Sequence, residues 1–171
     1  TRRSSDLLSG ESGTHDVKVG AGWQHVKGRS IIDTYATGLF LWATDPKAFP
    51  IAYGYGVGSS DVEVSTDRIA AFVQDDWRPL PNLTVSLGLR YDVDTNGNNE
   101  GFTHPLVPEP READTNNFQP RLGFSWDVAK NGQFLARGGW GLFVGRNLLV
   151  PSFTELQQNG VTGRKLYTRV N

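Results

Sequence analysis

The strongest constraint on the fold is a segment, residues 82–92 (NLTVSLGLRYD), in which every second side chain is apolar. Because successive side chains of a β-strand point to opposite faces, this pattern predicts a sheet with one apolar and one polar side. Residues 118–128 repeat the pattern further along the chain. The apolar residues of the first segment share one face: Leu83, Val85, Leu87, Leu89 and Tyr91.

Strands of about ten residues with aromatic ends and short polar turns are typical of strands that cross a lipid bilayer. We predict strands at residues 15–27, 34–43, 66–78, 82–94, 118–128 and 133–145, with a possible further strand near 162–170. Short connections at 28–33, 79–81 and 129–132 alternate with long polar ones at 44–65, 95–117 and 146–161. The predicted fold class is all-β: part of an antiparallel transmembrane β-barrel, about six or seven strands of a larger barrel. Its short turns would be periplasmic, and the loop 95–117 would be extracellular and mobile.

A secreted β-sandwich module for adhesion or glycan binding is the alternative, because its half-buried strands show the same alternation. The unequal turns and the aromatic residues near strand ends, Trp77, Tyr91 and Trp126, favour the barrel. Trp23 and Trp140 are expected deeper in their strands.

Composition excludes several classes of function. The net charge of −1 argues against a nucleic-acid partner, and the absence of cysteine excludes a disulfide framework, a thiolate metal site and a cysteine nucleophile. The chain has no methionine and no apolar leader, so we expect it to be part of a longer polypeptide. A partial barrel leaves unpaired backbone groups at its edges, so the isolated chain is expected to aggregate or to need detergent.

The titratable residues do not form a catalytic pattern. Asp75 and Asp76 are neighbours on a strand and so point to opposite faces, with Asp76 expected inward and hydrogen-bonded and Asp75 outward at the rim or at a bulge. His15, His25 and His104 are scattered, and no serine elbow lies near them. We therefore predict no enzyme activity, no catalytic residue and no cofactor.

Residues 92–97 match the first half of an EF-hand calcium loop through Asp92, Asp94, Asn96 and Gly97. Thr103 stands where that loop needs a bidentate glutamate, so a solvated turn is the default and calcium binding stays open. The sequence assigns no metal ligand and identifies no ligand-binding residues.

Several charged and small residues are expected on the inward face. Cations there could attract anionic substrates, although salt bridges to a plug or to wall acids such as Asp16 and Asp92 are favoured. Inward glycines would leave room for a plug or for strand curvature. The cations are Lys18, Arg90, Arg121 and Arg137, and the glycines are at positions 20, 22, 88, 123, 139 and 141.

Residues 72–92 (FVQDDWRPLPNLTVSLGLRYD) resemble a hallmark hairpin of TonB-dependent outer-membrane receptors, most closely of the Oar-like group. Residues 117–127 (NFQPRLGFSWD) and 134–146 (FLARGGWGLFVGR) resemble the next hairpin. The resemblance covers about residues 15–146 and implies that 1–171 is one part of a plugged barrel of about 22 strands in a Gram-negative outer membrane.

The function that this resemblance implies is energy-coupled uptake or surface binding of a substrate. Its implied partners are outer-membrane lipid, the protein's own plug domain, the TonB complex and an unknown extracellular ligand. The plug, the TonB box and an N-terminal regulatory-like domain have no counterpart in this sequence.

Overall fold

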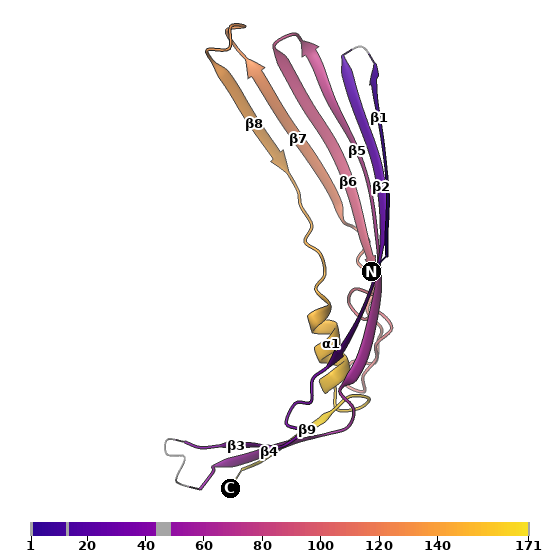
Figure 1. Cartoon of the computed structure of the whole chain (residues 1–171), viewed down its shortest axis with the longest axis vertical. Helices are drawn as coiled ribbons and strands as arrows, with labels where there is room; N and C mark the ends of the chain where they lie inside the picture. The colour runs from indigo at the N-terminus through magenta and orange to yellow at the C-terminus, as the bar shows by residue number, and fades with distance from the viewer. Residues whose placement is uncertain (1, 13, 44–48, 171) are drawn as a thin grey trace. The chain divides into compact units, whose positions relative to one another are not determined.

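The computed structural model describes residues 2–12, 14–43 and 49–170, which divide into two compact units (Figure 1). The first unit consists of the chain up to residue 26 with 66–95 and 113–147, and the second of 27–65, 96–112 and the chain from 148 onward. The elements are β1 (Arg2–Ser12), β2 (His15–Ile31), β3 (Leu39–Leu41), β4 (Ala52–Val57), β5 (Asp61–Leu80), β6 (Leu83–Thr95), β7 (Phe118–Asp127), β8 (Leu135–Gly141), α1 (Leu149–Gln158) and β9 (Lys165–Val170).

The larger sheet has the order β1-β2-β5-β6-β7-β8, and β3-β4-β9 form a second, smaller sheet. The pairs β1–β2, β5–β6, β6–β7 and β7–β8 are antiparallel. In the part of the chain that is described, the larger sheet is open, with β1 and β8 at its edges. Short turns join β5 to β6 and β7 to β8, whereas residues 96–117 connect β6 to β7, which confirms the predicted alternation for these strands.

The register places the apolar residues of neighbouring strands on one continuous face. Leu87 lies opposite Leu122, which in turn lies opposite Trp140, and all three are more than two-fifths exposed. Among the described residues the only buried apolar side chains are Ala52 and Val64, both in the second unit. A soluble protein rarely leaves so large an apolar face uncovered. The sheet therefore has the one-sided apolar surface that the sequence predicts, and none of the described residues buries it.

Helix α1 packs on the C-terminal part of β2, within the second unit. The buried Gln157 donates hydrogen bonds to the backbone oxygens of Ser30, at 3.1 Å, and Ser60, at 2.8 Å. Gly28 leaves space for the ring of Phe153. Among the described residues, no helix is long and apolar enough to cross a membrane.

Two predicted boundaries are wrong in the same region. β2 continues through the predicted turn at 28–33 as far as Ile31 and stays beside β5, where Lys27 pairs with Glu63 and Arg29 with Asp61. Of the predicted strand 34–43 only Leu39–Leu41 is a strand. Left-handed backbone at Tyr35 (φ 56°) and Gly38 (φ 85°) forms a turn just before it.

Three elements of the structure, β1, β4 and α1, are absent from the prediction, and others differ in position. β1 is mostly polar, β4 lies inside the predicted loop 44–65, and α1 lies inside the predicted loop 146–161. Residues 44–48 of the first of these loops lie outside the described residues. β9 confirms the strand near 162–170, but it belongs to the smaller sheet. Trp23 lies in the middle of β2, and Trp140 lies opposite Leu122 in the middle of β7, so both are deeper than the strand ends, as predicted.

Candidate functional site

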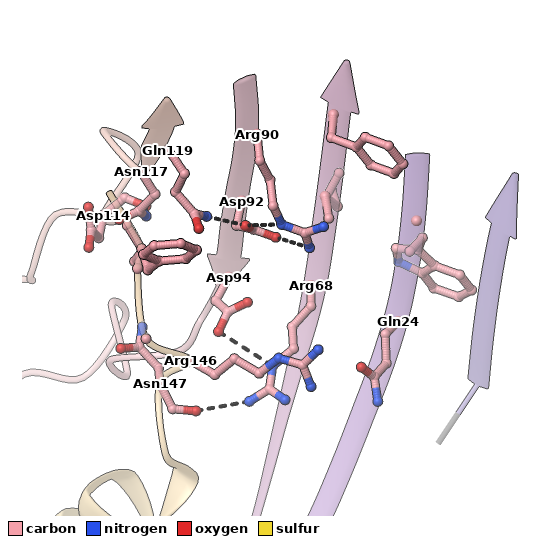
Figure 2. Close-up of a pocket in the computed structure, with 18 of the residues that line it drawn as sticks. Gln24, Arg68, Arg90, Asp92, Asp94, Asp114, Asn117, Gln119, Arg146 and Asn147 are labelled. Atoms are coloured by element: carbon pink, nitrogen blue, oxygen red, sulfur yellow. Dashed lines mark hydrogen bonds and ion pairs between the residues drawn. The ribbon is translucent and has the colours of Figure 1, made fainter. Parts of the chain in front are cut away.

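The polar face of the first unit carries a hollow of 490 Å³ (Figure 2). Strands β2, β5, β6 and β7 supply its wall, and the segments 113–117 and 142–147 supply its margin. A volume of this size falls in the range of small-molecule sites. Its charged lining consists of four arginines, Arg68, Arg90, Arg121 and Arg146, and three aspartates, Asp92, Asp94 and Asp114.

Arg90 and Asp92 neutralise each other within the hollow. They are two residues apart on β6 and so share a face. Both Nε and Nη2 of Arg90 donate to the carboxylate of Asp92 at 2.7 Å, which is the bidentate geometry of strong arginine–carboxylate pairs. The buried side chain of Gln119, on β7, also donates to Asp92 (Figure 2). This pair is therefore part of the wall.

Arg68 holds the segment that follows β8. Its Nη2 donates to the backbone oxygen of Asn147 at 2.9 Å, and its Nε lies 3.4 Å from the Asp94 carboxylate. That Nε is buried and lacks a hydrogen-bond acceptor among the described residues. Leu142 strengthens the attachment, since its N–H donates to the backbone oxygen of Pro120 at 3.0 Å. Residues 142–147 are thus fixed against the inner wall.

Arg121 stacks on the ring of Phe143, with its guanidinium carbon 4.7 Å from the ring centroid. Gly141 makes the stack possible: a β-carbon there would come within 3.2 Å of Arg121 Cγ and 3.3 Å of the Phe143 ring. Neither Arg121 nor Arg146 pairs with a carboxylate in the described parts of the chain. Arg146 extends from the 142–147 segment toward Arg68 (Figure 2). Two arginines of the hollow, Arg121 and Arg146, therefore have no ion pair among the described residues.

The inward cations predicted from the sequence fall into two groups. Lys18 pairs with Asp16 at 3.5 Å and with Asp76 at 3.2 Å, and Arg90 pairs with Asp92, which confirms salt bridges to wall acids. Arg121 and Arg137 have no such partner among the residues described. Arg137 lies on β8 opposite Ser125, outside the hollow.

Asp76 also accepts a hydrogen bond from Ser86 at 2.6 Å, which confirms its predicted inward position. Asp75 lies opposite Leu87 on the apolar face, as predicted, and the register shift comes after it, between Trp77 and Leu80. At two predicted inward glycines the wall's own side chains fill the space. Phe72 lies over Gly20, and Arg121 and Phe143 lie over Gly141.

The residues of the calcium hypothesis do not form a loop site. Asp92 and Asp94 belong to strand β6, and their carboxylates pair with Arg90 and Arg68. Asn96 donates to the backbone oxygen of Ser65 at 2.9 Å. The two carboxylates that the hypothesis needed around one ion are therefore engaged with arginines.

The three histidines lie in three separate places. His15 Nδ1 is 2.7 Å from Asp75 Oδ2, and its ring stacks on Trp77. His25 Nδ1 is 2.9 Å from Asp67 Oδ1. His104, in the second unit, donates from Nε2 to the backbone oxygen of Asn159 at 3.1 Å.

A family model described as an outer membrane beta barrel domain matches residues 1–169. The chain therefore belongs to the outer membrane β-barrel domain family, and the protein is located in the outer membrane. No curated protein and no solved structure matches the chain. The family decides between the two predicted folds in favour of the barrel. In a barrel wall the apolar face meets lipid and the polar face, with its hollow, lines the lumen.

Proposed function

We propose that the chain forms part of the wall of a TonB-dependent receptor of the Oar-like group, which takes up a substrate from outside the cell. The single observation that carries the proposal is the hollow on the polar face, where charged side chains surround a space of small-molecule size. A barrel wall that served only as an anchor would need no such recess between its inward side chains. The resemblance of residues 72–92 and 117–146 to receptor hairpins supports the same function.

The partners that this function requires are outer-membrane lipid, a plug domain, the TonB complex and an extracellular ligand. We propose no nucleic-acid partner and no catalysed reaction. His15 and His25 lie near aspartates on the apolar face of the sheet, whereas a catalytic histidine needs a nucleophile within reach.

The test is whether the whole protein binds TonB. Tagged whole protein, extracted from outer membranes in detergent, is mixed with the purified periplasmic domain of TonB, and complex formation is measured by co-purification and calorimetry. We expect a saturable complex, while an unrelated outer-membrane barrel serves as the control. A protein that binds TonB no better than this control would overturn the proposal.

A further inference from the structure

We propose that the hollow binds a small organic anion, with its carboxylate on Arg121 and Arg146 and its apolar part against Phe143. This inference deepens the proposed receptor function and rests on it for the way the ligand reaches the site. It names the chemical class of the ligand and the residues that recognise it.

The charge balance of the hollow favours an anion. Two of its arginines are matched by wall acids, through the pairs Arg90–Asp92 and Arg68–Asp94. Arg121 and Arg146 have no ion pair in the described chain. The lining contains one further carboxylate, Asp114, which also has no ion pair there. Charged groups in a cleft with low-dielectric walls raise the local concentration of ligands of opposite sign.

Arg121 is held in a geometry that leaves it free to bind. Its guanidinium carbon lies over the Phe143 ring, and its N–H groups donate no hydrogen bond among the described residues, so they are available to a ligand. That planar fork matches the two oxygens of a carboxylate. Gly141 leaves the space that Arg121 and Phe143 occupy, and Arg68 fixes the segment that carries Phe143 and Arg146. The arrangement is preorganised, which reduces the entropy lost on binding.

The apolar part of the hollow indicates that the ligand has an apolar group beside its carboxylate. Phe143 lines the hollow on the polar face of the sheet, and 73% of it is exposed. An apolar ring beside unpaired cations suits a ligand that joins a carboxylate to a flat apolar body. Benzoate is the probe with this chemistry, and benzamide is its neutral counterpart of nearly the same shape.

The first experiment uses the wild-type whole protein in detergent. Phenylglyoxal modifies accessible arginines, and peptide mass spectrometry reads each arginine separately. We expect benzoate, but not benzamide, to slow modification of Arg121 and Arg146. Arg137 is the internal control, because it lies on the same polar face without an ion pair among the described residues and outside the hollow. Equal protection of all three arginines, or none, would overturn the proposal.

The second experiment measures benzoate affinity by calorimetry in two matched variants. Losing a charged hydrogen-bond partner weakens binding about tenfold or more, so Arg121→Gln should bind benzoate correspondingly less well. Arg137→Gln removes the same charge and should leave the affinity unchanged. If the whole protein's own acidic side chains fill the hollow, the wild type will show no benzoate heat and the proposal fails.

These outcomes are separate from those for TonB. Benzoate binding through Arg121 without TonB binding would support the anion site and contradict the proposed receptor function. TonB binding without benzoate binding would support the receptor function and contradict the proposed ligand class.

Discussion

Replacing Glu155 with glutamine should loosen the long loop between β6 and β7. Glu155, on α1, accepts hydrogen bonds from both Nη atoms of Arg111, one of them at 2.8 Å, and from Asn99 at 3.0 Å. Asn99 is buried and also donates to the backbone oxygen of Ser152 at 3.1 Å. The loop that the sequence predicts to be mobile is thus attached to a helix within the second unit.

The expected magnitude follows from the exposure of the pair. The side chain of Arg111 is 44% exposed, so solvent screens the pair and its contribution is about 1 kcal/mol, the upper end for surface ion pairs. Glu155→Gln keeps the shape of the side chain and removes only its charge. A loss of about 1 kcal/mol corresponds to about a fivefold increase in the population of the open loop.

Amide hydrogen exchange of the whole protein in detergent measures this opening. The reporters are amides bonded within the loop, such as Phe102 N–H to the Asn99 oxygen at 2.9 Å and Val107 N–H to the His104 oxygen at 2.8 Å. Both should exchange about fivefold faster in the variant. Glu112→Gln is the control, because Glu112 is exposed in the same loop and has no ion pair in the described chain.

The pH dependence gives a second check on the same contact. The hydrogen bond from Arg111 holds the pKa of Glu155 below its unfolded value, against the opposing effect of desolvation. The stabilisation is therefore complete above the unfolded pKa and is lost as the pH falls through the folded pKa. Wild type and variant should differ at neutral pH and converge in acid. Equal exchange at neutral pH, or a difference that persists in acid, would refute the reasoning.

Two further predictions concern the two faces of the larger sheet. Gly20→Val should destabilise the barrel by about 1–3 kcal/mol, because its side chain would overlap Phe72, whereas Gly10→Val, in open space, should not. Leu87→Arg should cost about 2–4 kcal/mol, since Leu87 lies in mid-strand on the lipid-facing side. Leu106→Arg, in an exposed loop, is its control. Guanidinium unfolding of the whole protein in lipid vesicles measures all four, and equal costs within either pair would contradict the assigned faces.

The sequence determined the two faces of the sheet. Alternation with a period of two is a local property of the chain, so residues 82–92 reveal which side chains meet lipid without any knowledge of their neighbours. Local sequence patterns also predicted the short turns of the β5–β6 and β7–β8 hairpins and the inward position of Asp76. The barrel fold followed from these faces and from the unequal connections.

Only the tertiary structure decided which inward cations are free. Arg90 and Arg121 look alike in the sequence, since both alternate with apolar residues on a strand. Arg90 pairs with Asp92 on its own strand. Arg121 lies opposite Gly141 on the adjacent strand β8, and its guanidinium carbon lies over the ring of Phe143. The surroundings of Arg121 depend on cross-strand register and on where residues 142–147 return to the wall. Neither is encoded in the period of a single strand, so the hollow could not be predicted from the sequence.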